Sequence, residues 1–275
     1  MPKEASLQML NPSLIHDLAQ QLQTARTTQT QLRQLSKAHP EATVASAYAI
    51  QDAWLQLELN QGRFVKGRKI GLTSKALQQT FKATEPTHAS LMNDMFFTDG
   101  AELPTHRFIA PRIESELAFV LHKPLKGPNI TLFDALDAIA YVTPAIEIID
   151  SRMQLIDPQT KGTRSVIDQV ADFAGCAGIV VGGRPMHPDA FDISRVGAIV
   201  FKNGSIEDTG VSAAVMNHPV NAVVWLANKL AESGEHLQAG ELILAGAFTR
   251  PVPSCLGDSF HIDFGILGCI GFKWA

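Results

Sequence analysis

Apolar residues recur every three or four positions within the first sixty residues, which is the spacing of an amphipathic helix. One helix is expected to begin at Asn11 and Pro12, because that pair is typical of a helix N-terminus. A second is expected to begin at Thr43, whose hydroxyl group can cap it. The apolar stripes are Leu14, Leu18 and Leu22 in the first helix and Ala47, Ile50, Trp54 and Leu57 in the second.

After Gly62 the pattern changes to short runs that are rich in β-forming residues and separated by turn residues. Asn203 and Gly204, between two of these runs, predict a tight hairpin. The predicted strands are GRKIGL at 67–72, ESELAFVLH at 114–122, YVTPAIEIID at 141–150, GCAGIVVGG at 175–183, VGAIVFKNGS at 196–205, GELILAGAF at 240–248, DSFHIDFG at 258–265 and ILGCIGFKW at 266–274.

Only two further helices are expected, one at about 131–140 and one that begins at 217–219 and stops at Gly234. Strands therefore outnumber helices and do not alternate with them, which disfavours a parallel, doubly wound sheet. We predict an α+β fold. In it a helical N-terminal segment, residues 1–65, packs on a mixed β-sandwich or rolled sheet formed by residues 66–275.

Composition places the chain among core-forming soluble proteins, since 45% of its residues are hydrophobic and 18% are charged. The formal net charge of -4 argues against a nucleic-acid partner or an anionic membrane surface. No run approaches the ~20 apolar residues of a membrane span, and the N-terminus has no apolar signal region. Three separated cysteines argue against a disulfide framework or a zinc cage. We expect buried thiols and a cytoplasmic location.

Two acids stand inside an apolar predicted strand. Glu114 and Glu116 are two residues apart, so their side chains share one face of the strand. Neighbouring like charges on a half-buried face repel each other, and Mg²⁺ or Mn²⁺ would neutralise both because hard cations prefer carboxylate oxygens. The alternative is a solvated strand face, which the apolar run 117–121 disfavours.

A third acid, Glu147, is flanked by apolar residues in another predicted strand. Buried glutamates are rarely unpaired, so Glu147 would complete a three-carboxylate metal site if the two strands are neighbours. Asp150 stands at the end of the same strand beside Ser151 and Arg152, and we expect it to form a local turn or to pair with an arginine.

Lys69 enters a short apolar strand between glycines that permit close approach of a ligand. A desolvated lysine beside a metal can have a depressed pKa and act as an acid or base. The alternative is an exposed lysine on an edge strand. Phosphate-binding glycine loops, a nucleophile elbow and paired histidine motifs are absent, so hydride transfer, kinase and serine-hydrolase functions have no support in the sequence.

Taken together, these segments resemble the hydratase and decarboxylase branch of the fumarylacetoacetate hydrolase superfamily, over nearly the whole chain. The segments that carry the resemblance are KIGLTS at 69–74, NDMFF at 93–97, PRIESE at 111–116, PAIEIIDSR at 144–152, NHP at 217–219, WLANKL at 225–230 and TRPVP at 249–253. The resemblance implies the β-roll of the C-terminal domain of that superfamily. It also implies a Mg²⁺ or Mn²⁺ site at Glu114, Glu116 and Glu147, which agrees with the strand argument.

The resemblance further implies a hydro-lyase of meta-cleavage aromatic catabolism, which adds water to a 2-oxo-4-enoic acid. The favoured substrate is a 2-oxo dicarboxylic acid, 2-oxohept-4-ene-1,7-dioate. Lys69 is then a catalytic group, and the substrate-binding residues are Leu72, Ser74, Arg112 and Arg250. Arg250 and Arg112 compete as partners of the distal carboxylate. A homo-oligomer is implied, as is association with a paralogous pathway enzyme.

The chain departs from the branch at two places. Thr87 stands where hydratases carry an aspartate that is a partner of the lysine, and His88 is then the neighbouring group with a suitable pKa for proton transfer. The segment 172–175 reads DFAG where Asp-Asn-Ala is usual. Three functions therefore stay open: a hydratase, a decarboxylase of a 2-oxo diacid such as 4-oxalocrotonate, and a weakly active structural paralogue.

Overall fold

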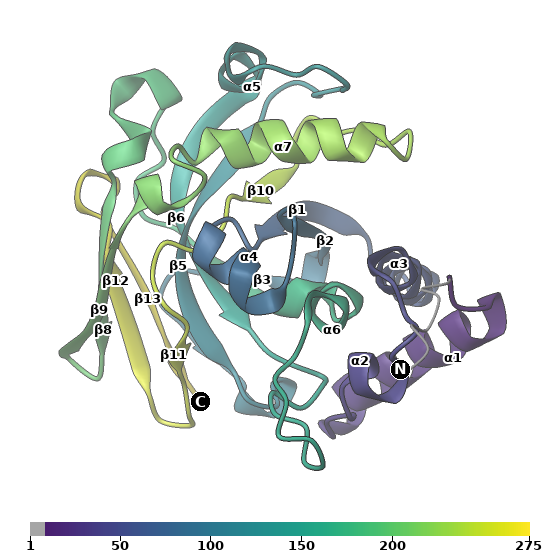
Figure 1. Ribbon diagram of the computed structural model, residues 1–275. Helices are drawn as coiled ribbons and strands as arrows, with labels where there is room; N and C mark the ends of the chain where they lie inside the picture. The colour runs from purple at the N-terminus through teal and green to yellow at the C-terminus, as the bar shows by residue number, and fades with distance from the viewer. Residues whose placement is uncertain (1–8) are drawn as a thin grey trace.

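A computed structural model describes residues 9–275, whose strands form two curled sheets (Figure 1). The strands are β1 Val65–Gly71, β2 Thr87–Met92, β3 Phe96–Thr98, β4 Ala101–Leu103, β5 Arg112–Leu121, β6 Ile139–Ile149, β7 Cys176–Val181, β8 Gly197–Lys202, β9 Ser205–Val211, β10 Leu242–Leu244, β11 Val252–Pro253, β12 Ser259–Asp263 and β13 Cys269–Trp274. The α-helices are α1 Pro12–Thr28, α2 Leu35–Ala38, α3 Val44–Asn60, α4 Lys75–Phe81, α5 Leu132–Ala138, α6 Val166–Ala171 and α7 Val220–Ala231. Single turns of 3₁₀-helix are Asn93–Met95, Thr105–Arg107, Phe173–Gly175, Pro188–Ala190, Ile193–Arg195, Ser212–Ala214 and Gly265–Leu267.

The larger sheet is mixed, with the strand order β2-β1-β10-β5-β6-β7-β3 and with β11 added to β5. Parallel pairs are β1 with β10 and β3 with β7, whereas β5 and β6 are antiparallel neighbours over their whole lengths. The second sheet has the order β4-β13-β12-β8-β9 and lies at the opposite side of the molecule from α1 and α3 (Figure 1). The predicted α+β fold with mixed, rolled sheets is therefore confirmed.

The N-terminal helices form where their caps were expected. The Asn11 side chain accepts a hydrogen bond from the Leu14 amide at 2.8 Å, and the Thr43 hydroxyl accepts one from the Ser46 amide at 3.0 Å. These helices share one apolar core with α6 and the turn that follows it: Leu18, Leu22, Ile50, Trp54, Val170 and Phe173 are all buried there. The boundary at residue 65 between two units stays a prediction.

Strands β5 and β6 are apolar on both faces, as expected for strands with cover on both sides. One face, with Ile113, Leu117 and Phe119, packs into the large core beneath α7 and the second sheet. The other face carries Ala118 and Ala145 and forms a smaller core inside the curl of the larger sheet. The three acidic residues of these strands lie on this second face.

The predicted elements differ from the structure in three respects, the first being that the short strands β2, β3, β4 and β11 were not predicted. In GELILAGAF only Leu242–Leu244 is a strand, because Gly246 adopts φ +116° and its N–H donates to a side chain instead of a neighbouring strand. Helices α2, α4 and α6 were not expected, since at four, seven and six residues each gives little periodic signal, whereas the equally short α5 was recognised. The Asn203–Gly204 hairpin between β8 and β9 is confirmed.

The cysteines follow the prediction only in part. Cys176 is buried, whereas Cys255 and Cys269 are exposed at surface positions. The prediction of buried thiols was wrong for these two because each lies at an outward-facing position of a turn or strand end. Among the described residues, no helix combines the length and the apolar character that a membrane crossing requires.

Candidate active site

Three carboxylates meet on the inner face of the larger sheet. Glu114 lies directly opposite Glu147 in the β5–β6 register, and Glu116 is the next residue of β5 on that face. One carboxylate oxygen from each residue lies within 4.8 Å of the others. Glu116 and Glu147 are buried, and Glu114 is partly exposed. The strand with Glu114 and Glu116 and the strand with Glu147 are therefore neighbours, as predicted.

The three carboxylates have fewer hydrogen-bond and charge partners than their burial requires. Glu116 Oε2 accepts a hydrogen bond from the Gly246 amide at 2.8 Å, and Glu147 Oε1 accepts one from Lys69 Nζ at 2.6 Å. Glu147 Oε2 is buried and has no hydrogen-bond partner. Burial, followed by the charge of Glu147, raises the pKa values of Glu114 and Glu116. The donor set and the unpartnered oxygen both fit a divalent cation such as Mg²⁺ or Mn²⁺.

Proton release should accompany metal binding. Because the pKa values of Glu114 and Glu116 are raised, part of the metal-free protein carries protons there near neutral pH. A cation must displace them, so Mg²⁺ affinity is expected to fall as the pH falls through the neutral range. Titration calorimetry in two buffers with different ionisation enthalpies counts the released protons. Binding without proton release at pH 7 would contradict this electrostatic description.

Lys69 lies at the centre of the site. Its side chain is buried on β1, an internal strand between β2 and β10, and Nζ donates to Glu147 and to the carbonyl oxygen of Ala174 at 3.1 Å. Burial disfavours the ammonium, but the charges of Glu147 and the other glutamates outweigh it, so the pKa of Lys69 is raised. The pKa of Lys69 is thus raised without a metal, because three carboxylates surround one ammonium, and the depressed pKa that was expected beside a bound metal stays a prediction.

The Ala174 carbonyl reaches Lys69 through an unusual backbone path. Phe173 and Ala174 both have left-handed conformations, with φ +48° and +49°, which cost of order 1 kcal/mol or more each for non-glycine residues. The preceding Asp172 fixes this turn, because it is buried and binds the Nε–H of Arg152. The DFAG segment thus positions the lysine.

A cavity of about 220 Å³ opens beside the carboxylates. Leu72 and Arg112, two residues for which the resemblance implies substrate binding, both line it. Arg164, just before α6, and Gln169, within it, also line the cavity. Neither was predicted, because a six-residue helix gives no periodic signal to place them. The remaining lining residues are Lys69, Ile70, Gly71, Thr73, Leu77, Phe81, Glu114, Glu116, Ile149, Asp150, Ala174, Gly175, Ala247 and Pro251.

Three of the predicted catalytic and substrate-binding residues do not line this cavity. His88 pairs with Ile70 in the β1–β2 register, so its ring lies on the opposite face of the sheet from Lys69, where it stacks on Tyr48 at 4.8 Å between ring centroids. Burial, followed by the charge of Arg68, lowers the pKa of His88 to about 4. The proposed catalytic role of His88 is corrected on this geometry.

The other two are Ser74 and Arg250. The Ser74 hydroxyl caps α4 by accepting from the Leu77 amide, which turns it away from the cavity. The Arg250 side chain is 83% exposed and pairs with Asp208, although the next residue, Pro251, lines the cavity. Neither side chain contacts the predicted site. Asp150 has neither of its two expected roles: it does not pair with an arginine, and two of the three amides from which it accepts, those of Ile109 and Ala110, belong to the segment before β5, with only the Ser151 amide being local.

Thr87, and not its neighbour His88, lies on the face of the sheet that carries Lys69. It pairs with Gly71 on the same face as Lys69, and its hydroxyl lies in the space that a Cβ on Gly71 would enter. The Gln169 side chain borders the same space. Thr87 Oγ1 and Gln169 Oε1 are both buried without a hydrogen-bond partner, so two polar groups beside Lys69 are available to a water molecule or ligand.

Comparisons with known proteins give three informative similarities, and no family model matches the chain. The 2-oxo-hept-4-ene-1,7-dioate hydratase of Escherichia coli is 51% identical over 257 residues, covering 94% of this chain and 96% of that protein. The structure of 4-oxalocrotonate decarboxylase from Pseudomonas putida G7, in complex with magnesium and adipate, superposes with a TM-score of 0.91 at 32% identity and covers 97% of this chain and 99% of the other. A Yersinia pestis CO92 protein assigned to the fumarylacetoacetate hydrolase family has a TM-score of 0.56 at 17% identity, over 76% of this chain and 92% of that one, and shares the fold.

Proposed function

The chain belongs to the hydratase and decarboxylase branch of the fumarylacetoacetate hydrolase superfamily, and we propose that it is a hydro-lyase acting on 2-oxohept-4-ene-1,7-dioate. The observation that carries the proposal is the buried cluster of Glu114, Glu116, Glu147 and Lys69 at the edge of one cavity. The 51% identity to a hydratase of this substrate supports it. The reaction adds water across the distal double bond to give a 4-hydroxy-2-oxo diacid.

We propose Mg²⁺ as the cofactor, held by Glu114, Glu116 and Glu147, with Mn²⁺ as the alternative. Carboxylate ligands suit both ions, and a structural neighbour was solved with magnesium. When bound, the ion would supply a Lewis acid that stabilises negative charge on the 2-oxygen of the substrate. The backbone N–H of Gly246 fixes the orientation of Glu116, and Lys69 fixes that of Glu147.

Within this proposal Lys69 is the proton donor. Its Nζ carries a proton at neutral pH, since its pKa is raised, and it lies in the wall of the cavity between Glu147 and Ala174. Transfer of that proton to the dienol carbon makes the far alkene electrophilic. The Thr87 hydroxyl, which is unpartnered beside Gly71, and the Gln169 side chain, which lines the cavity, would orient the attacking water. A threonine orients water without removing its proton, so that proton would pass to the Lys69 amine, which the first transfer leaves neutral.

Two arginines fit the distal carboxylate of a diacid. Arg112 and Arg164 both line the cavity, and Arg164 is held in place by a 2.7 Å hydrogen bond to the Ser151 hydroxyl. Guanidinium groups bind carboxylates with paired hydrogen bonds, so this end of the cavity favours substrates that carry a second acid. Arg112 therefore stays a candidate from the sequence, and Arg164 joins it.

Replacing Arg164 by glutamine is expected to raise the KM for the seven-carbon diacid by roughly 10- to 100-fold, the equivalent of one charge-assisted hydrogen bond worth about 1.5–3 kcal/mol. The KM for the monoacid 2-hydroxypenta-2,4-dienoate should not change. Arg250→Gln is the matched control, because that side chain is exposed and pairs with Asp208. Equal effects of Arg164→Gln on the diacid and the monoacid would show that Arg164 does not read the second carboxylate.

A decarboxylase is the second candidate, favoured by Thr87, since decarboxylases of the branch also lack the aspartate, and by the TM-score of 0.91 to 4-oxalocrotonate decarboxylase. An ultraviolet assay with Mg²⁺ and each dienol separates the two. Loss of dienol absorbance without CO₂ supports the hydratase, and CO₂ release as the main product rejects it. Silence with both substrates would favour a weakly active paralogue. The homo-oligomer, the paralogous partner and the cytoplasmic location stay predictions.

A further inference from the structure

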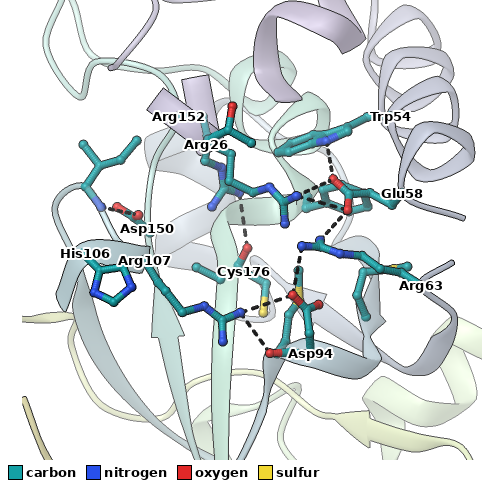
Figure 2. A pocket seen from close by; sticks show the side chains of 16 residues that line it. Arg26, Trp54, Glu58, Arg63, Asp94, His106, Arg107, Asp150, Arg152 and Cys176 are labelled. Atoms are coloured by element: carbon teal, nitrogen blue, oxygen red, sulfur yellow. Dashed lines mark hydrogen bonds and ion pairs between the residues drawn. The ribbon is translucent and has the colours of Figure 1, made fainter. Parts of the chain in front are cut away.

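A second cavity, of about 230 Å³, lies between the N-terminal helices and the larger sheet (Figure 2). Apart from Asp150, its lining residues differ from those of the candidate active site. Arg26 comes from α1, Arg63 follows α3, Arg107 ends a 3₁₀ turn and Arg152 follows β6. Four guanidinium groups from four separate segments thus meet at one place that the proposed reaction does not use.

The carboxylates in this cavity are shared among the arginines. Glu58 is fully buried and accepts hydrogen bonds from Arg26, Arg63 and the Trp54 indole. Asp94 accepts from Arg63 at 2.9 Å and from Arg107 at 3.2 Å. Three guanidinium groups are therefore matched by two carboxylates. The other acid in the lining, Asp150, binds backbone amides and contacts none of these arginines, so the three guanidinium groups outnumber the carboxylates that they contact by one, while Arg152 pairs with Asp172.

Polar groups in this cavity are left without partners. Arg26 Nε is buried and donates to nothing, and Asp94 Oδ1 is buried and accepts from nothing. Burial, opposed by Glu58 and reinforced by Arg63, lowers the pKa of Arg26, as expected where an anion is lacking. Figure 2 shows the guanidinium groups of Arg26 and Arg63 directed toward Glu58, and those of Arg63 and Arg107 directed toward Asp94. A ligand that offers both an acceptor and a donor would satisfy both orphaned atoms.

The rest of the wall is apolar and aromatic. Trp54, Met92, Met95, Ile109 and Phe173 line it, and the exposed side chains of His106 and Arg107 border its mouth. The volume is below the roughly 300–1,000 Å³ of pockets for drug-sized ligands, so the occupant has few heavy atoms. A short carbon chain against this wall, with its acid toward the guanidinium groups, fits these features.

We propose that this cavity binds a small hydroxycarboxylate, with its carboxylate among Arg26, Arg63 and Arg107 and its hydroxyl donating to Asp94. Carboxylates pair with guanidinium groups in a bidentate manner, so a ligand carboxylate would supply the partner that Arg26 Nε lacks. The hydroxyl accounts for the unpartnered oxygen of Asp94. The site is independent of the metal and of the proposed hydration reaction.

The test uses L-malate as the probe and the full-length protein freed of metal with a chelator, so that the candidate active site presents only carboxylates. Titration calorimetry should give saturable 1:1 binding, and malate should change the fluorescence of Trp54. Succinate, which lacks the hydroxyl, should bind at least threefold more weakly. Sodium chloride at matched ionic strength should not reproduce the signal. Absence of saturable malate binding, or equal binding of succinate and malate, would overturn the proposal.

Arg107→Gln is the first variant, because Arg63 still pairs with Asp94 when Arg107 is lost. It should weaken malate binding by at least tenfold, whereas Arg195→Gln, at a side chain 84% exposed on another turn, should not. The double variant Arg26→Gln with Glu58→Gln removes one charge of each sign, so that no carboxylate is left buried at position 58 without the charge of Arg26. It should also weaken malate binding at least tenfold. Wild-type affinity in both variants would show that malate binds elsewhere.

Discussion

Glu116→Gln is expected to abolish activity and to weaken Mg²⁺ binding by on the order of 100-fold or more, since a neutral amide replaces one of three charged ligands. The metal-free protein should behave in the opposite way. Burial and the charge of Glu147 raise the pKa of Glu116, so its ionised form costs free energy when no cation is present. Removing that charge should raise the Tm of the metal-free protein and largely remove the increase in Tm that Mg²⁺ produces in the wild type.

Isothermal titration calorimetry and thermal unfolding with and without Mg²⁺ measure both effects. Glu102→Gln is the matched control, because Glu102 is an exposed strand glutamate that pairs with Lys273 at the surface. It should change neither the affinity nor the metal-dependent part of the Tm. Unchanged Mg²⁺ affinity in Glu116→Gln would refute the metal site. Lost affinity together with a lower Tm without metal would instead mean that the charge of Glu116 stabilises the metal-free fold.

The cluster of three carboxylates could be predicted from the sequence because strand geometry is periodic. Side chains two residues apart on one strand lie on the same face of the sheet. A lone glutamate in an apolar strand must lie beside a group that offsets its charge. The β5–β6 register puts Glu147 opposite Glu114, so both parts of that argument hold. Lys69 was identified in the same way, from a charged side chain within a short apolar strand.

The sequence could not show which residue of β2, Thr87 or His88, lies beside Lys69. The segment THASLM of β2 shows no alternation of polar and apolar residues, so it was not predicted as a strand and the facing of its side chains was unknown. The register of β2 against β1 directs Thr87 toward Lys69 and His88 away from it. A suitable solution pKa had favoured His88. A one-residue difference in facing reverses that choice, because alternate side chains of a strand lie on opposite faces.

Long-range contacts explain the remaining differences. Arg164 and Gln169 reach the cavity only because α6 packs against the N-terminal helices, and no local pattern encodes that packing. Arg250 was expected at the site because its segment, TRPVP, carries the family resemblance. The strand before that segment ends at Leu244, and the following turn directs the side chain toward Asp208 at the surface. Arginines in loops therefore carry less positional information than acids inside strands.

Lys69→Met is expected to lower kcat by about 10²- to 10⁴-fold, the usual contribution of a positioned proton donor. Methionine has a similar length and no proton, so it keeps the packing of a side chain that is 3% exposed. Mg²⁺ affinity should be retained or increased, because a positive charge 2.6 Å from a carboxylate oxygen of Glu147 is removed. This opposition between lost turnover and retained metal binding separates a proton-transfer role from a structural one.

The thermal stability of Lys69→Met should also differ between the metal-free and the Mg²⁺-bound protein. Without metal, Lys69→Met leaves Glu147 buried beside two other carboxylates with no counter-charge, and breaking such a buried pair costs about 3–5 kcal/mol. The Tm of the metal-free variant should therefore fall, and saturating Mg²⁺ should restore most of the difference, because the cation offsets the same charge. Lys66→Met is the control, since Lys66 is an exposed lysine of the same strand. A variant that binds Mg²⁺ as the wild type does and keeps its kcat would exclude Lys69 as the proton donor, whereas one that no longer binds Mg²⁺ would assign Lys69 to the architecture of the metal site.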